Sequence, residues 1–338
     1  MQEVLQYEAS YGSLFWVVIL VTAMIYIYTN LSFAANGSRL NLSRGGDIYK
    51  AYCGRHIGAF FDFFSAFFCY MSFVVMLGGA NSTAMQQWGL PNGVGAIVLA
   101  VLVVVTVCSG LQGILKALSF LGPVIIGSLL FISGVSAVNS TIGFNAGLSA
   151  IDGNVYKIAQ IGGGNPLASG ASYGGFVILW FAAFLSEIGA KNRLSEVNKA
   201  MILSSLFIFG VASLCCVALI SNIDVLYSAD IPALVLANQI SPALGLSFAL
   251  VVFAGIYTSA VPLLWTGVRR LAEEGTGMYR RITFVGGVLG CVIACLIPYA
   301  PLLNVLYGLN GYLGFILMFF MIVNDVRFLV GGRLRQRS

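Results

Sequence analysis

Nine long apolar runs, separated by polar connections, dominate the pattern of hydrophobic and polar positions. A helix crosses the hydrocarbon core of a bilayer in ~20 residues, and lipid cannot satisfy the backbone groups of isolated strands. A transmembrane barrel would instead show alternation over ~10 residues. The pattern predicts an all-α polytopic membrane protein with spans at 12–35, 57–86, 92–109, 114–138, 172–189, 201–223, 243–268, 282–299 and 302–325.

Two connections between these spans are long. Residues 139–171 are rich in Gly, Asn and Ser, which predicts an external loop. Residues 224–242 carry Leu, Val and Ile at a spacing that favours a short amphipathic helix at the membrane interface.

Composition supports the membrane assignment. The chain has 338 residues, of which 59% are hydrophobic and 9% charged, so hydropathy overrides the two soluble domains that length alone would favour. The seven cysteines lie almost all within apolar runs and form no CxxC pair. We expect buried free thiols, because a metal site there lacks further ligands. No cofactor is predicted.

The basic residues mark the orientation of the chain. Sixteen of the 17 fall on alternate connections and the tail, and only Lys157 falls on the other side. Cytoplasmic loops hold the excess of Lys and Arg, so the tail 326–338 is predicted to be cytoplasmic, in a plasma (inner) membrane protein. The net charge of +5 is therefore a topology signal, and no nucleic-acid partner is expected.

The order of the spans favours two inverted repeats, a common plan of transporters. Residues 172–325 hold five spans, and residues 1–138 hold four that match the last four members of such a unit. The opening MQEVLQYEASYG lacks the basic run and cleavage site of a signal peptide. We expect it to be the outer half of a broken first helix whose remainder was lost or mis-annotated upstream.

Three stretches resemble the bacterial YkvI family: MQEVLQYEASYG at 1–12, MLGGANSTAMQQWGLP at 76–91 and FAGIYTSAVPLLWTGVRRL at 253–271. That family is similar to the amino acid–polyamine–organocation superfamily. The resemblance implies a LeuT-like bundle of two inverted five-helix repeats, here lacking most of its first helix. It also implies a symporter of a small, amino-acid-like solute driven by Na⁺ or H⁺. The family's glycine-rich break in the first helix is absent from this sequence.

The stretch YTSAVP places two hydroxyls, Thr258 and Ser259, in the middle of an apolar span. Pro262 lacks an amide hydrogen and so frees a carbonyl oxygen toward a cavity. The resemblance implies that hydroxyls on this helix hold Na⁺. The alternative is that both hydroxyls bond back to carbonyls one turn earlier.

The span that opens the second repeat carries five candidates for the substrate pathway. Gly174 and Gly175 either belong to a broken helix that aims its ends at a substrate or permit close helix packing. Trp180 and Phe184 either line a cavity or pack in the core. Glu187 is either a gating or proton-carrying carboxylate or the partner of the lysine four residues later.

Three further polar residues are pathway candidates. Asp62 lies within an aromatic-rich span, where a carboxylate costs ~2–3 kcal/mol unless it faces a cavity or a partner. It either has a functional role or reaches toward Arg55 or His56. Asn81 and Asn310 stand among small residues, which favour either close packing or substrate contact.

The sequence argues against two classes of function. It contains no GxxxxGK[ST] phosphate-binding loop, so an ATP-driven pump is not expected. The single histidine cannot build a Ser–His hydrolase or a two-histidine metal site, so no enzyme is expected. We expect a secondary transporter; the alternatives are a membrane scaffold or sensor, or a truncated inactive transporter. The oligomeric state stays open.

The genomic DNA upstream of Met1 tests the expectation of a lost half-helix. We expect an in-frame apolar stretch of ~20–35 codons with closely spaced glycines, enough to complete one helix. In-frame stop codons close to Met1 would remove the first member of the first repeat.

Overall fold

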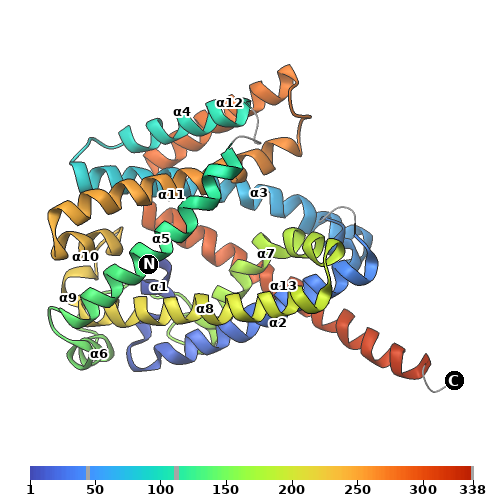
Figure 1. Cartoon of the computed structure of the whole chain (residues 1–338), viewed down its shortest axis with the longest axis horizontal. Coiled ribbons are helices and arrows are strands. Elements are labelled where there is room, and N and C mark those ends of the chain that lie inside the picture. Colours follow the sequence, from blue (N-terminus) through green and yellow to red (C-terminus); the bar gives the residue numbers. More distant parts are fainter. Residues whose placement is uncertain (43–45, 110–113, 336–338) are drawn as a thin grey trace. The chain divides into compact units, whose positions relative to one another are not determined.

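All regular structure in the described part of the chain is helical, as the hydropathy pattern predicts. The computed structural model describes residues 1–42, 46–109 and 114–335 (Figure 1). Arg44 and Arg337, which contribute to the charge pattern, lie outside the described residues. In chain order the elements are α1 (Gln2–Tyr7), the 3₁₀ helix η1 (Ala9–Leu14), α2 (Phe15–Leu40), α3 (Asp47–Trp88), α4 (Val94–Ser109), α5 (Ile114–Val138), α6 (Phe144–Asp152), α7 (Pro166–Lys191), α8 (Leu194–Ser221), α9 (Ile223–Leu226), α10 (Pro232–Ile240), α11 (Pro242–Arg269), α12 (Gly277–Leu296) and α13 (Tyr299–Arg335).

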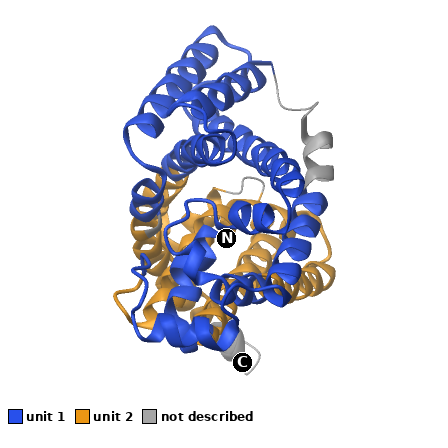
Figure 2. Cartoon of the chain, turned by 90° about the vertical axis from the view of Figure 1, so that its left-hand side faces the viewer, with its two compact units in different colours: residues 1–15, 66–160, 212–306 blue, residues 16–65, 161–211, 307–338 orange. Residues whose placement is uncertain are grey.

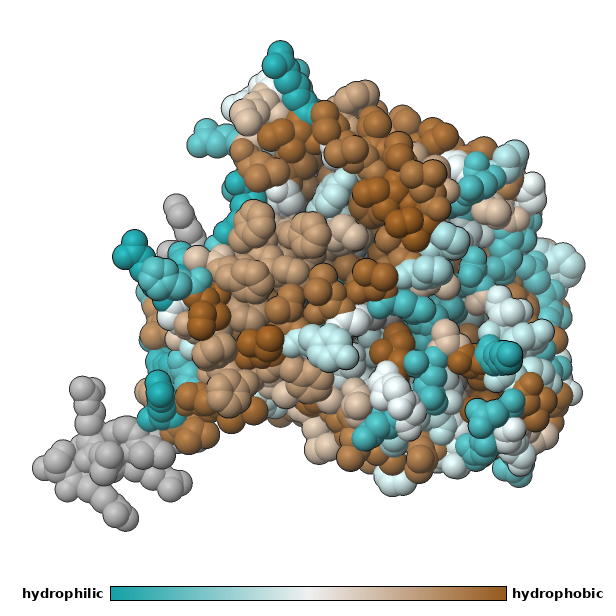
Figure 3. Space-filling model, turned by 180° about the vertical axis from the view of Figure 1, so that it is seen from behind, coloured by the Kyte–Doolittle hydropathy of each residue, from teal (hydrophilic) through white to brown (hydrophobic). Residues whose placement is uncertain are grey.

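Nine of these helices coincide with the nine predicted spans. Seven of the described helices are long and apolar enough to cross a membrane. The other two, α4 and the part of α5 from Gly122 to Val138, are shorter apolar helices. Figure 3 shows apolar residues gathered over a broad part of one face, as expected of a surface that contacts lipid. The prediction of an all-α, multi-pass membrane protein is confirmed.

The connection predicted at 139–171 is shorter than the sequence predicts. The expected loop 139–171 contains α6, and α7 already begins at Pro166. The side chain of Asn165 accepts hydrogen bonds from the amides of Leu167 and Ala168. This N-cap, followed by a proline at the first helical position, starts a helix within a stretch whose Gly and Ser content predicts a loop.

The described residues form two compact units that interleave along the chain (Figure 2). Helices α3, α8 and α13 contribute residues to both units, and each unit draws on both of the predicted repeats. Unit 1 comprises residues 1–15, 66–160 and 212–306, and unit 2 comprises residues 16–65, 161–211 and 307–338.

In unit 1, α11 packs against α4, α5, α10 and α12. Helix α10 is the short helix predicted within 224–242. Gly287 of α12 lies against Val104 of α4, and Gly290 lies against Phe73 of α3. Small residues thus let helices approach closely where lipid supplies no hydrophobic driving force for their association.

The N-terminal segment of unit 1 is bent. Gly12, between η1 and α2, has φ +51° and ψ −123°, a conformation that glycine adopts at little cost. The amide of Ser13 donates to Oδ1 of Asp152, at the end of α6, at 3.1 Å. Helix α1 is therefore a separate element, and the contact with α6 stabilises the bend that separates it from α2.

In unit 2, α7 meets α2 and α13 at backbone distance. A Cβ atom at Gly314 of α13 would overlap the carbonyl oxygen of Gly175 in α7, and Gly37 of α2 faces the backbone of Ser186 in the same way. Helix α7 is continuous from Pro166 to Lys191. The glycines of α7 lie where neighbouring helices come too close to leave room for a side chain.

Helix α3 consists of two arms that fold back on each other. Gly54 has φ +75° and ψ −177°, which interrupts the helix. The ring of Tyr49 stacks on that of Phe61 at 6.3 Å, although 12 residues of straight helix would separate them by ~18 Å. The predicted span at 57–86 therefore corresponds to the second arm. The first arm, residues 47–53, is a packed element that hydropathy alone misses.

Gly314→Ala tests the close packing of α13 on α7. The added methyl group meets the Gly175 carbonyl, so we expect a free energy of unfolding lower by ~1–3 kcal/mol. Gly308→Ala is the matched control, because this position on the same helix has open space around it and alanine favours helix. Thermal unfolding of the purified protein in detergent measures both variants. Equal melting temperatures would contradict the packing.

Candidate substrate and ion site

A cavity of about 440 Å³ lies within unit 1. This volume falls within the range of ~300–1,000 Å³ typical of small-molecule sites. Its walls are apolar with a few polar groups, and they come from α1, α3, α5, α10, α11 and the first residue of α13. The lining residues are Met1, Gln2, Glu3, Val75, Met76, Gly79, Gly122, Ile125, Leu129, Asp230, Ile231, Pro232, Ala233, Phe248, Val252, Gly255, Ile256, Thr258, Ser259 and Tyr299.

The two hydroxyls expected to bind an ion both line this cavity. Thr258 Oγ1 and Ser259 Oγ donate to the carbonyl oxygen of Gly255, at 2.7 and 3.1 Å. Both hydroxyls therefore bond back to the preceding turn, which is the alternative left open by the sequence. A hydroxyl that donates its hydrogen keeps its acceptor lone pairs, so the two oxygens are still available to a cation.

Two carboxylates border the same cavity. Glu3 of α1 lies 3.6 Å from the N-terminal ammonium, and Asp230 accepts a hydrogen bond from Ser82 Oγ at 3.1 Å. Tyr299 stands beside them in the wall. Sequence reasoning missed Asp230 and Tyr299 because they lie at a connection and a helix start. Among the described residues, no three His, Cys, Asp or Glu side chains converge as a metal site.

The segment that carries the cavity wall at α1 also holds buried polar groups. Glu8 is fully buried, and neither carboxylate oxygen has a hydrogen-bond partner among the described residues. The same holds for the side-chain carbonyl oxygens of Gln2 and Gln6. Cys216 of α8 is close enough to Glu8 for an electrostatic interaction. Burial without a donor disfavours a charged carboxylate strongly, which makes Glu8 a candidate proton carrier that the sequence did not reveal.

Asn81 forms hydrogen bonds within the turn between α3 and α4 and does not line the cavity. Its amide nitrogen donates to Asn92 Oδ1 at 2.7 Å, and its Oδ1 accepts from the amide of Gly93 at 2.8 Å. The neighbouring small residue Gly79 lines the cavity instead.

The five candidates on α7 belong to unit 2. Gly174 and Gly175 pack closely against α2 and α13. The ring of Trp180 contacts that of a phenylalanine one turn earlier at 4.7 Å, and Phe184 is 61% exposed. The carboxylate of Glu187 forms an ion pair with the ammonium group of the lysine four residues later, at 3.6 Å. Helix packing or ion pairing within unit 2 thus explains the positions of most of these five residues.

Asp62 and Asn310 also belong to unit 2. The half-buried carboxylate of Asp62 lies against Gly46, because the fold-back at Gly54 brings the start of the first arm of α3 beside the second. Asn310 is fully buried within α13. The carboxylate of Asp62 therefore lies beside a connection rather than among apolar side chains alone.

Unit 2 contains a polar cluster that sequence reasoning missed. The Asp325 carboxylate of α13 accepts hydrogen bonds from Tyr28 Oη at 3.1 Å, Ser32 Oγ at 2.5 Å and Asn36 Nδ2 at 2.9 Å. Asn36 also donates to Tyr52 Oη at 3.0 Å. The three α2 residues are spaced four apart and share one face of the helix. Their spacing is visible in the sequence, but their partner lies 289 or more residues further along the chain.

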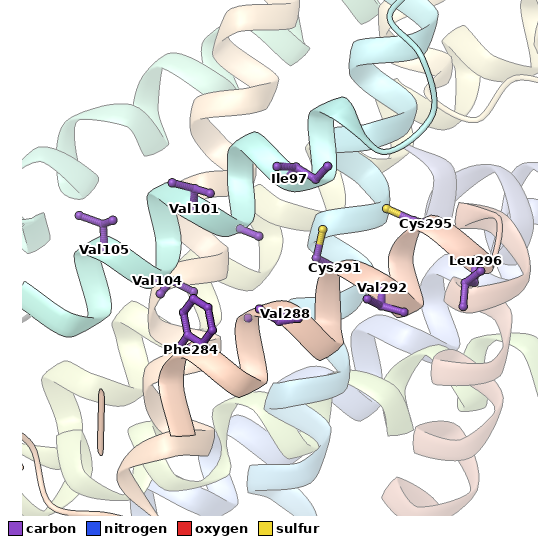
Figure 4. A pocket seen from close by; sticks show the side chains of 12 residues that line it. Ile97, Val101, Val104, Val105, Phe284, Val288, Cys291, Val292, Cys295 and Leu296 are labelled. Carbon is purple, nitrogen blue, oxygen red and sulfur yellow. The ribbon is translucent and has the colours of Figure 1, made fainter. Parts of the chain in front are cut away.

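A second cavity of unit 1 is apolar. It has a volume of about 610 Å³ and lies between α4 and α12 (Figure 4). Valine, leucine, isoleucine and phenylalanine side chains line it together with the thiols of Cys291 and Cys295. Because the described lining residues include no charged or amide side chain, this groove suits lipid chains rather than a polar solute.

Comparison with known proteins identifies the fold. No family model and no curated protein match the sequence. Thirteen chains of solved structures match, among them a crystal structure of a mutant manganese transporter from Eremococcus coleocola. That match has a TM-score of 0.52 and 14% identity and covers 96% of this chain and 76% of the other. The chain therefore has a LeuT-like transporter fold, and the expected fold class is confirmed.

Glu8→Gln tests whether the buried carboxylate lacks a stabilising partner. The amide has the same shape but cannot ionise, so we expect an apparent melting temperature at neutral pH equal to or above that of the unmodified protein. Glu8→Lys places a longer side chain with an ammonium group, which is costly to bury, in the same volume and should lower the melting temperature strongly. Glu273→Gln and Glu273→Lys, at an exposed turn, are the matched controls. A marked loss of stability in Glu8→Gln would reveal a partner.

Proposed function

We propose that this chain is a secondary active transporter of a small, amino-acid-like solute, coupled to Na⁺ or H⁺ and working by alternating access. The cavity of unit 1 is the observation that carries the proposal. A zwitterionic solute needs acceptors for its ammonium group and donors for its carboxylate. Glu3 and Asp230 supply the first, and the hydroxyl group of Tyr299 in the wall supplies the second.

Two features of unit 1 support coupling to an ion. The oxygens of Thr258 and Ser259 face the cavity with unused lone pairs, which suits Na⁺. Glu8 is buried without a donor among the described residues and lies in the segment that also forms the wall, which suits a proton. Either ion would be bound on an element that contacts the solute site.

The charge pattern supports the orientation that we propose. The basic connections and the tail face the cytoplasm, the connection with α6 faces outward, and the protein lies in the plasma (inner) membrane. We propose inverted repeats at 1–138 and 172–325. The bend at Gly12 supports a broken first helix, and the three motifs support kinship with the YkvI family.

The manganese substrate belongs to the structural neighbour and is not carried over to this chain. The polar groups of the cavity suit an organic zwitterion, and its described lining includes two carboxylates, Glu3 and Asp230. A scaffold or sensor of the same fold would bind a solute without moving it across the membrane. Transport assays distinguish the two functions.

Proteoliposomes containing the purified protein test the function. We expect at least one radiolabelled amino acid in a full panel to accumulate when an inward Na⁺ or H⁺ gradient is imposed, and not without a gradient. Accumulation that does not depend on either gradient would contradict ion coupling. Binding of an amino acid without uptake under either gradient would support the sensor.

The double variant Thr258→Ala/Ser259→Ala tests the ion site. We expect binding of ²²Na⁺ and sodium activation of uptake to fall at least ~10-fold, because two oxygen ligands are lost. Folding should change little, since each hydroxyl bonds only within its own helix. The matched control is Ser247→Ala/Thr266→Ala, which removes two similarly bonded hydroxyls of α11 outside the cavity. Equal sodium activation in the two double variants would exclude the site.

A further inference from the structure

Unit 2 contains a cavity of about 820 Å³ at the end of α2 where the chain enters the basic connection. Its lining comes from the end of α2, from the fold-back of α3 at Cys53 and Gly54, and from α13. The inference drawn from this cavity depends on the proposed membrane orientation but not on transport.

Two arginines give this cavity a positive charge. Arg39 and Arg327 both line it and are exposed, and none of the described lining residues is acidic. Neither guanidinium forms an ion pair with a carboxylate of the described residues. Arg39 is held in place, because it donates to Asn36 Oδ1 and lies over the ring of Phe328 at 3.9 Å.

The nearest acidic residue on α13 does not neutralise these arginines through an ion pair. Asp325 accepts three hydrogen bonds from neutral donors on α2, among them Asn36 Nδ2. Asn36 therefore links the two groups, with its amide nitrogen on the carboxylate and its oxygen on Arg39. These contacts hold the guanidinium of Arg39 at the edge of the cavity, while the carboxylate of Asp325 already accepts hydrogen bonds from α2.

The rest of the lining is largely aromatic. Phe319, Phe320 and Phe328 of α13 contribute to it, with Asn324 as a polar group. The Asn324 amide donates to the carbonyl of Ala51 at 2.9 Å, which connects α13 to the first arm of α3. One cavity thus combines a cationic edge with an aromatic wall.

We propose that this cavity binds one anionic phospholipid of the cytoplasmic leaflet. The guanidinium groups of Arg39 and Arg327 would hold its phosphate through charge-assisted hydrogen bonds, and the phenylalanines would contact its acyl chain. Basic cavities among helices on the cytoplasmic side suit such headgroups. A free phosphate would use the arginines only and leave the aromatic wall without a ligand.

Native mass spectrometry of the purified full chain in detergent tests the proposal. We expect one phosphatidylglycerol molecule to remain bound, and phosphatidylcholine with the same acyl chains to bind at least ~10-fold more weakly, because it carries no net negative charge. Inorganic phosphate at the same concentration should give no comparable occupancy. Equal binding of the two lipids, or equal occupancy by phosphate, would overturn the proposal.

Variants locate the site. Arg327→Gln should weaken phosphatidylglycerol binding ~10-fold, because one of the two guanidinium groups of the cavity is lost. Arg39→Gln should do the same, with its melting temperature checked because it also removes the contact with Phe328. Arg280→Gln, an exposed arginine of α12 outside the cavity, is the matched control and should bind as the unmodified protein does. If Arg280→Gln and Arg327→Gln weakened phosphatidylglycerol binding equally, the effect would come from net charge alone, and the proposed site would be overturned.

Discussion

Lipid offers no hydrogen-bond partners, and the placement of polar groups in this chain follows from that constraint. The described backbone satisfies it with helices. The hydroxyls of α11 satisfy it by donating to carbonyls of their own helix, and Asn81 satisfies it by capping a turn. Among the described residues, several buried polar atoms without a hydrogen-bond partner gather in the α1 segment, at Gln2, Gln6 and Glu8. Part of the same segment also lines the cavity of unit 1.

The fold also depends on glycine, which permits close helix packing and sharp bends. Where α7 meets α2 and α13, backbones touch at positions such as Gly175 and Gly314, where a side chain would overlap a carbonyl group. At Gly12 and Gly54, positive φ angles let the chain bend or fold back. These bends separate α1 from α2 and bring Tyr52 to the polar cluster at Asp325. Close packing and sharp bends thus position the polar groups that the helices alone could not bring together.

The sequence predicts the helices well because hydropathy acts locally. All nine spans, the helix within 224–242 and the hydroxyls at Thr258 and Ser259 follow from short windows of sequence. The early start of α7 was missed because a cap at Asn165 outweighs glycine-rich composition. Asp230, Tyr299 and Asp325 could not be assigned, because their neighbours come from distant parts of the chain. The burial of Glu8 could not be predicted either, because burial depends on how elements distant in the sequence pack together.

The hydroxyls of Thr258 and Ser259 on α11 line the proposed solute cavity of unit 1. The most direct measurement is the reactivity of Ser259→Cys toward a charged, membrane-impermeant thiol reagent in vesicles, in a background without the seven native cysteines. We expect rapid modification, slowed by the transported solute, while Val288→Cys in the apolar groove of α4 and α12 stays unreactive. A cysteine at 259 as inert as the one at 288 would contradict it.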